Sequence, residues 1–149
     1  MDIIITIIIL ILIIGSIIGL IKAAIDNKKE FDILHSQKKV DIETFRYYHN
    51  RIAKHYQAYH TGEKDGPGAY VLTNKENRKT FIGVSSEVLR AANNSLIDKT
   101  TPFYEDLQYQ PFMIHILMLD DIDIPTLEFL EKKLIKITNA SCGYNRNHK

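Results

Sequence analysis

Acidic side chains that could hold a divalent metal ion gather in the last third of this chain. Asp120, Asp121 and Asp123 stand close together, and Glu128 and Glu131 follow in a segment with helical periodicity. Carboxylate oxygens are ligands that Mg²⁺ and Mn²⁺ prefer. Residues three apart share one stripe of a helix, so either glutamate could point from the edge of a core into a cleft.

Both sets of carboxylates also have a structural interpretation. The aspartates directly precede Pro125 and a predicted helix, where negative charge complements the positive end of the helix dipole. We favour this interpretation for the aspartates. On spacing alone, each glutamate is expected to be a solvated side chain, because glutamates are mostly exposed.

Histidine and cysteine offer little metal chemistry here. His49, His55 and His60 lie on or near one predicted helix, but none are four residues apart, so their spacing does not put two imidazoles on one face. His115 lies in a nearly apolar run, where a hydrogen-bonded core histidine is the expected role. Cys142 is the only cysteine, which excludes an intramolecular disulfide and a cysteine-based zinc cage and fits a reducing compartment.

Apolar patterning predicts an α+β unit in the second half of the chain. Residues 69–72 and 80–84 are short β-prone runs joined by a polar connection, which predicts a hairpin. The run 112–119 is nearly all apolar and predicts a central strand buried on both faces. We therefore expect a short antiparallel β-sheet flanked by helices.

Three helices are predicted around this sheet. The first is capped by Ser85 or Ser86 and sets Arg90 apart from its apolar residues. A short second helix is expected over 102–107. The last helix is expected to bury one apolar stripe, made of Leu127, Leu130, Leu134 and Ile137.

The start of the chain predicts a single N-terminal transmembrane helix. Residues 3–21 carry no charge over about 19 positions, which is enough for a helix to cross the hydrocarbon core of a bilayer. A cleaved signal peptide is the alternative. It would need a basic start and a small-x-small cleavage site, whereas the only early charge is Asp2, and Lys22 precedes the Ala23-Ala24 pair. We favour a retained anchor in the lipid bilayer.

Charges around the anchor predict its orientation. Lysines gather directly after the span, whereas only Asp2 and the α-amino group precede it, so the positive-inside rule places the C-terminal domain in the cytoplasm. Gly15 and Gly19, four residues apart, form a helix-packing pattern that predicts a contact for a homodimer. The formal net charge of +1 carries no overall footprint of nucleic-acid binding, so any such binding must be local.

These patterns divide the chain into three parts. Residues 1–24 are the transmembrane anchor, residues 25–64 a juxtamembrane amphipathic helical linker, and residues 65–149 the α+β domain. Within the linker, a helix over 41–59 with Asp41 as its cap ends at a turn-rich string that marks the domain boundary.

Five short features follow one another through the domain. They are Gly68-Ala69-Tyr70, Phe81-Ile82-Gly83, Arg90, Glu131 and Gly143-Tyr144-Asn145. Their order and separations, and the hairpin, helix, strand and helix around them, resemble the GIY-YIG nuclease family, which includes homing endonucleases and restriction enzymes. The resemblance implies a small GIY-YIG-like domain.

The resemblance also implies an enzyme, an endonuclease that hydrolyses DNA phosphodiester bonds by in-line attack of water with one divalent metal ion, Mg²⁺ or Mn²⁺. Glu131 would hold the metal, and Arg90 would meet the charge that builds on the phosphoryl oxygens. Asn145 would order the site by hydrogen bonding, and Tyr70 would orient or deprotonate the water. RNA is not excluded as a substrate.

This chain departs from the family pattern at three places, one of which is the stretch after the second motif, where Val84, Ser85 and Ser86 replace a basic residue that members often have. Where the second motif normally has a tyrosine, Phe81 keeps the ring and lacks the hydroxyl. Asn94, one turn after Arg90, stands where many members have histidine or tyrosine. Lys79 and Asn94 are the candidate substrate-binding residues.

Three functions are compatible with these features, and we rank them in order. The first is a membrane-anchored, metal-dependent endonuclease that faces the cytoplasm. The second is a catalytically weakened domain of the same fold that binds nucleic acid or a protein partner at the membrane. The third is a bitopic membrane adaptor whose functional contact is the tyrosine-rich helix over 41–59.

Overall fold

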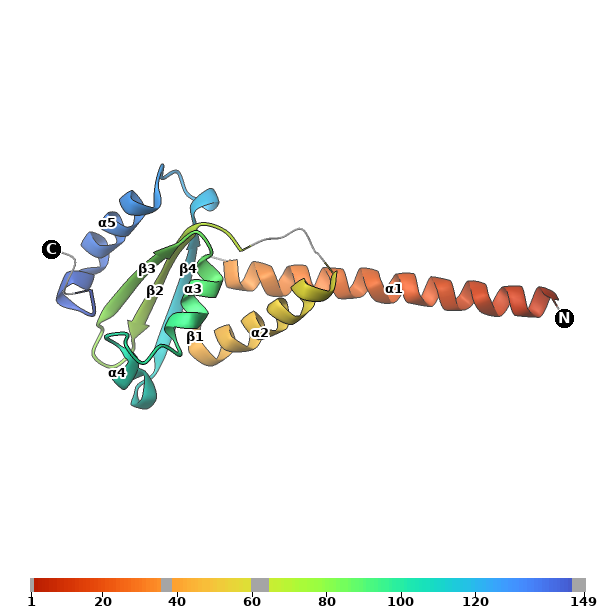
Figure 1. The fold of residues 1–149 in the computed structure, drawn as a ribbon, viewed down its shortest axis with the longest axis horizontal. Coiled ribbons are helices and arrows are strands. Elements are labelled where there is room, and N and C mark those ends of the chain that lie inside the picture. The colour runs from red at the N-terminus through yellow and green to blue at the C-terminus, as the bar shows by residue number, and fades with distance from the viewer. Residues whose placement is uncertain (1, 36–38, 60–64, 146–149) are drawn as a thin grey trace.

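An antiparallel sheet of four strands, in the order β1-β4-β2-β3, forms the centre of the folded unit (Figure 1). The structure is a computed structural model that describes residues 2–35, 39–59 and 65–145. The strands are β1 (Val40–Asp41), β2 (Gly68–Asn74), β3 (Thr80–Ser85) and β4 (Phe112–Met118). The helices are α1 (Asp2–His35), α2 (Ile42–Tyr59), α3 (Val88–Ser95), α4 (Tyr104–Tyr109) and α5 (Leu127–Thr138), with short 3-10 turns η1 (Leu119–Asp121) and η2 (Ala140–Cys142). The predicted α+β class, with an antiparallel sheet and one N-terminal apolar helix, is confirmed.

The hairpin of β2 and β3 is confirmed. Its register pairs Tyr70 with Gly83 and Leu72 with Phe81, so these four residues lie on one face of the sheet. The predicted central strand is β4, which pairs with both β1 and β2. Its residues alternate between buried and half-buried, and His115 is one of the half-buried ones, so burial on both faces was wrong. The reason is that α5 covers the second face only in part.

The two faces of the sheet support two separate cores. The larger core contains Tyr70 and Leu72 together with buried residues of α2, α3 and β4. The smaller core lies on the opposite face, where Val71 and Ile82 pack with Leu134 of α5. The sheet is therefore sandwiched between α2 and α3 on one side and α5 on the other.

The stripe predicted for α5 is only partly correct. Leu130 is buried and Leu134 packs against the smaller core, but Ile137 is 69% exposed. Ile135 takes the place expected for Ile137. This helix lies over the edge of the sheet, and an edge strand offers too narrow an apolar surface to cover a whole stripe.

Residues assigned to the linker pack into the same unit as the domain. Asp41 caps α2 as predicted, since its Oδ1 accepts a hydrogen bond of 2.8 Å from the Thr44 amide. Val40 and Asp41 add a strand to β4, and Ile42 and Phe45 join the larger core. The folded unit thus includes Val40 onward, whereas the sequence places its boundary at residue 65. Side chains 51–64, including His55 and His60, lie outside the described residues.

The cap of α3 differs from the one predicted. Neither Ser85 nor Ser86 caps the helix. Instead, the two carboxylate oxygens of Asp65 accept hydrogen bonds of 2.9 Å from the Leu89 and Arg90 amides. Local spacing cannot reveal this cap, because its donors and acceptor are 24 and 25 residues apart.

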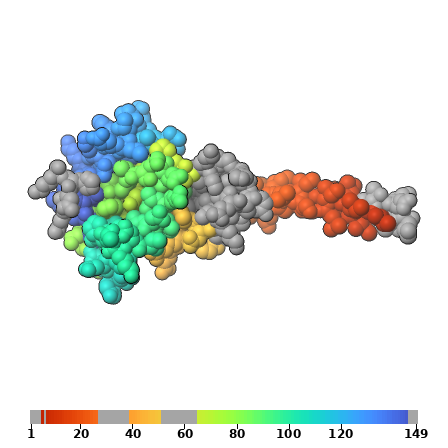
Figure 2. Space-filling view, viewed as in Figure 1, coloured from red at the N-terminus to blue at the C-terminus, as the bar shows by residue number. Residues whose placement is uncertain are grey.

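Within the described residues, α1 contains one segment long and apolar enough to cross a membrane by length and composition. The segment is Ile7–Asp26, with a mean hydropathy of 2.8, and none of it is buried. Figure 2 shows the apolar part of α1 standing clear of the folded unit on the face in view. A Cβ atom added at Gly15 or Gly19 would meet no neighbour within 4 Å, so both glycines leave room for another helix.

Candidate functional site

The ring of Tyr70 lies across Gly83 of the neighbouring strand. A Cβ atom added at Gly83 would overlap the Cζ and hydroxyl oxygen of Tyr70. The last residue of the second motif therefore has to be glycine for Tyr70 to keep this position. The two motifs of the hairpin are linked by this contact as well as by their strand register.

Tyr70 is a buried phenol. Its side chain is largely covered, with 6% of the residue exposed, and burial raises the pKa of its hydroxyl above the ordinary value, although a hydrogen bond with the Ser95 side chain lowers it in part. A raised pKa keeps the hydroxyl protonated at neutral pH. Tyr70 is therefore a neutral hydrogen-bonding group at this edge of the sheet.

Phe81 is half-buried beside Tyr70. The ring centroids of Phe81 and Tyr70 are 6.0 Å apart, and those of Phe81 and Phe103 are 4.9 Å apart. Such tilted pairs are favourable aromatic contacts. The position of the usual second tyrosine thus contributes packing and no oxygen atom.

Arg90 lies on α3, which covers the same face of the sheet as Tyr70. Its guanidinium is exposed and pairs with Glu87 at 3.2 Å, with side-chain exposures of 72% and 54%. Exposed pairs of this kind contribute about 0–1 kcal/mol. Arg90 can therefore leave Glu87 for a more strongly charged group, and Asn94, also exposed, lies one turn further along the helix.

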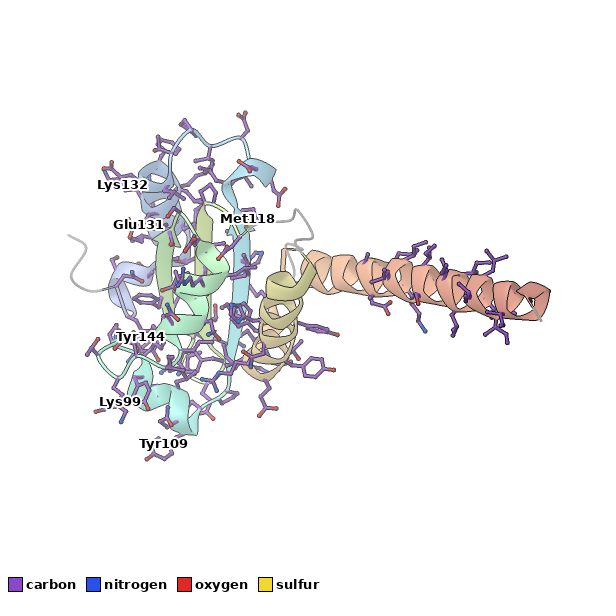
Figure 3. The ribbon with its side chains drawn as sticks, turned by 45° about the vertical axis from the view of Figure 1, so that its right-hand side comes forward. Lys99, Tyr109, Met118, Glu131, Lys132 and Tyr144 are labelled. Carbon is purple, nitrogen blue, oxygen red and sulfur yellow. The ribbon has the colours of Figure 1, made fainter. Side chains whose placement is uncertain are left out.

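The structure distinguishes the two glutamates of α5. Glu128 is exposed and pairs with Lys132 at 2.7 Å. Glu131 is half-buried and, within the described residues, makes no ion pair or hydrogen bond. Figure 3 shows Glu131 on α5, well apart from Tyr144, which lies toward the α4 end of the molecule. Of the two, Glu131 is the carboxylate left available to a ligand.

Asn145 extends the outer edge of β3. Its buried side chain accepts a hydrogen bond of 2.7 Å from the Ile82 amide and donates one of 2.9 Å to the Ile82 carbonyl. The amide of Tyr144 donates to the Thr80 carbonyl at 3.0 Å. The end of the chain thus satisfies backbone groups that an edge strand leaves open.

The site residues fall into two groups around β3. Tyr70 and Phe81 share one face, and Arg90 comes from the helix that covers this face. Glu131 belongs to α5, which packs on the opposite face, and Asn145 lies at the outer edge of β3. Within the described residues, no hydrogen bond or ion pair joins Glu131 to any of the other four, so no direct polar contact there links Glu131 to the rest of the site.

Within the described residues, no group of three or more histidine, cysteine, aspartate or glutamate side chains is placed to hold a metal ion. Asp120 and Asp121 lie in η1 and Asp123 follows it; all three are exposed, and the cap of α5 is Thr126. Glu131 can nonetheless fit Mg²⁺, because this ion often uses one or two carboxylates and completes its shell with water and substrate phosphates.

Three features of the region were not predicted. Asp65 caps α3, and Ser95 bonds to Tyr70. Asn74 is fully buried and donates to the Tyr144 hydroxyl at 3.0 Å, and this hydroxyl in turn donates to Asp106. All three depend on contacts between distant segments, and no local pattern marks them.

Lys79 is half-buried at the start of β3. Its ammonium group lies 5.8 Å from the centroid of the Tyr144 ring, within the range of a cation–π contact. The two candidate substrate-binding residues therefore lie in different parts of the fold, because Lys79 is near the hairpin turn and Asn94 is on α3.

No protein-family model, no curated protein and no solved structure matches this chain, so the GIY-YIG resemblance stays a prediction from the sequence.

Proposed function

We propose that this protein is a membrane-anchored endonuclease of the GIY-YIG type that hydrolyses phosphodiester bonds of DNA with a divalent metal ion. The observation that carries the proposal is the fit of Tyr70 over Gly83 at the edge strand. It gives a physical reason for two of the motif residues that the resemblance rests on. The availability of Glu131, in contrast to Glu128, adds support.

Glu131 would be the protein ligand of Mg²⁺ or Mn²⁺. The bound ion would supply positive charge to a phosphate oxygen and to the leaving group. Glu131 is half-buried and, among the residues that the structure describes, forms no ion pair that a metal ion would have to break, although the charge of the neighbouring Lys132 acts on it.

Arg90 and Tyr70 would act on the substrate itself. The exposed guanidinium of Arg90 would turn from Glu87 to the phosphoryl oxygens, where a planar bidentate donor stabilises the added charge. Because burial raises the pKa of Tyr70, its hydroxyl would orient the attacking water as a neutral group rather than take up its proton. Asn145 would hold β3 in place through Ile82.

One observation favours a second function. Phe81 is packed between Tyr70 and Phe103, so this position supplies no proton acceptor, and the remaining phenol is buried. A domain that binds nucleic acid or a protein at the membrane, with weakened catalysis, is therefore the alternative to an active nuclease.

The apolar segment Ile7–Asp26 would anchor the protein in the bilayer, with the folded unit in the cytoplasm. In Figure 1, α1 leaves the folded unit on the side of β4 and α2, and α5 lies on the other side. The edge strand β3 would therefore face away from the membrane, where a long nucleic acid can reach it.

The decisive experiment compares two glutamates of one helix. The full-length protein, in lipid nanodiscs, is incubated with plasmid DNA and Mg²⁺ or Mn²⁺, together with its Glu131→Ala and Glu128→Ala variants. We expect Glu131→Ala to slow nicking by about a hundredfold or more, since a metal ligand is lost. Glu128→Ala removes only an exposed pair with Lys132 and should nick like the wild type.

Equal activity of the two variants would refute the role of Glu131. If the wild type does not nick DNA and Phe81→Tyr gains Glu131-dependent nicking, the alternative function is supported, because the missing phenol would then be the reason for weak catalysis.

A further inference from the structure

A pocket of about 200 Å³ opens between the hairpin turn and the end of the chain. One wall is the turn from β2 to β3, with Asn77, Arg78 and Lys79. The other is the turn between α5 and η2, with Thr138, Asn139 and Cys142. These two turns are far apart in the sequence. They are joined by the backbone hydrogen bond that the Tyr144 amide donates to the Thr80 carbonyl.

The charged side chains that line this pocket are all positive. Among the described residues that line it, two side chains are cationic, Arg78 and Lys79, and none is a carboxylate. The other lining groups are amides, hydroxyls, a thiol and backbone. The nearest acidic group bonded to the lining is Asp106, whose carboxylate lies 3.5 Å from the Asn77 side chain and accepts the Tyr144 hydroxyl. The pocket thus suits an anion with several acceptor oxygens.

Arg78 stands at a position where its residue type is costly. It has a φ of 62°, and Asn139 on the opposite wall has a φ of 54°; within the described residues these are the two non-glycine residues with positive φ. Asparagine tolerates this left-handed conformation, whereas a long side chain pays about 1 kcal/mol relative to glycine. Glycine at position 78 would favour this turn more than arginine does. The conformation of the turn therefore does not explain the arginine, which indicates a role for its side chain.

The pocket lies along the same edge strand as the candidate nuclease site. Thr80 lines the pocket and lies three residues before Gly83 in β3. At about 3.3 Å per residue the separation is about 10 Å, which is the axial rise of about three nucleotides of one DNA strand.

We propose that this pocket binds a backbone phosphate of the nucleic acid a few nucleotides from the bond that is cleaved. Arg78 and Lys79 supply the charge, and the side-chain amide of Asn139 supplies a neutral donor. The proposal rests on the proposed nuclease function for the identity of the ligand. It assigns to Arg78 a role that the family resemblance does not contain.

The test measures binding separately from cleavage. The full-length protein in nanodiscs of phosphatidylcholine, which has no net charge, is titrated into a fluorescent DNA duplex in EDTA, which prevents metal-dependent cleavage. Arg78→Gln and Lys79→Gln are compared with Lys99→Gln, which removes the same charge from an exposed position outside the pocket. We expect each pocket variant to raise the Kd about threefold or more at low salt and to lower the slope of log Kd against log salt by about 1.

The single cysteine provides a second measurement. Cys142 is exposed and lines the pocket, so a thiol reagent should modify it in the free protein. Bound DNA should slow this reaction in the wild type and in Lys99→Gln, and should slow it less in Arg78→Gln at the same DNA concentration.

The outcomes separate this proposal from the nuclease proposal. If Arg78→Gln and Lys79→Gln bind like Lys99→Gln, or if the wild type binds no DNA, the phosphate pocket is refuted. Glu131-dependent nicking would still support the nuclease in the first of these cases. If the pocket variants weaken binding and the wild type does not nick in Mg²⁺ or Mn²⁺, the pocket stands and the nuclease proposal fails.

Discussion

The contact between Tyr70 and Gly83 is the most specific feature at the scale of single residues. It explains why a tyrosine on one strand and a glycine on the next occur together, because any side chain at position 83 would occupy the place of the phenol. The same contact keeps Tyr70 buried, and burial raises the pKa of its hydroxyl. A group whose pKa is raised on folding stabilises the fold below its ordinary pKa, and this stabilisation is lost as the pH rises through the raised value. At neutral pH Tyr70 is thus a neutral hydroxyl that contributes its full packing.

Substitution of Gly83 tests this contact. We expect Gly83→Ala to lower the free energy of unfolding by about 1–3 kcal/mol, because the new methyl group overlaps the Tyr70 ring. The measurement is chemical denaturation of the protein in detergent. Displacement of Tyr70 should also bring its pKa back toward the ordinary value in an alkaline absorbance titration.

Gly66→Ala is the matched control. A Cβ atom there would lie 3.1 Å from the end of the flexible Met118 side chain, which can move aside, so this variant should lose less than about 1 kcal/mol. Equal losses in the two variants would contradict the special role of Gly83.

At the scale of elements, long-range hydrogen bonds determine how α3 and β3 are held. The first amides of α3 are satisfied from outside the helix: Asp65 accepts from Leu89 and Arg90, and the Gly66 carbonyl accepts from Val88. The N-terminus of α3 is therefore closed to a phosphate. Any contact between α3 and a nucleic acid must come from side chains such as Arg90 and Asn94.

The cap formed by Asp65 gives the next prediction. Asp65→Ala should lower the free energy of unfolding by about 0.5–2 kcal/mol, the usual cost of losing a side-chain cap. The measurement is the same denaturation experiment. Ser86→Ala removes a residue that local spacing predicts as the cap and should change stability by no more than about 0.5 kcal/mol. A larger loss in Ser86→Ala than in Asp65→Ala would mean that the local cap is the real one.

The edge strand β3 is protected in a different way. Asn145 bonds to both backbone groups of Ile82, so one side chain does what a further strand would do. This use explains why a buried asparagine follows directly after Tyr144, whose ring packs 6.1 Å from that of Phe103. The C-terminal motif thus closes both the edge of the sheet and the aromatic core.

At the scale of the whole molecule, the protein consists of a long N-terminal helix and a small folded unit. α1 is a single helix of 34 residues, which corresponds to about 50 Å, and its end contacts α2 and β4 (Figure 1). Because α1 is one helix that contacts the folded unit, the unit is held close to the end of the apolar segment. The candidate site on β3 lies at the opposite edge of the sheet from β1.

The single cysteine makes the orientation testable. The positive-inside rule predicts that the folded unit faces the cytoplasm. If it does, a membrane-impermeant maleimide should leave the exposed thiol of Cys142 unmodified in intact cells and modify it after permeabilisation. As a control, Asp2→Cys in a Cys142→Ser background should react in intact cells. Modification of Cys142 without permeabilisation would reverse the proposed orientation.

Much of the fold follows from the sequence alone. The hairpin, the central strand, the helix capped by Asp41 and the apolar N-terminal helix all depend on periodicity or on contacts within a few residues, and all are present. The sequence also singled out Tyr70, Phe81 and Gly83, whose types and spacing reflect strand pairing.

The tertiary structure decided the remaining features. Asp65 caps α3, and α5 is oriented so that Ile137 is exposed. Residues 40–45 pack into the folded unit, with Val40 and Asp41 paired to β4. The tertiary structure also separated Glu131 from Glu128 and brought Arg78 and Asn139 to one pocket. Each of these depends on which distant segment packs nearby, and the periodicity of a single element contains no information about its neighbours.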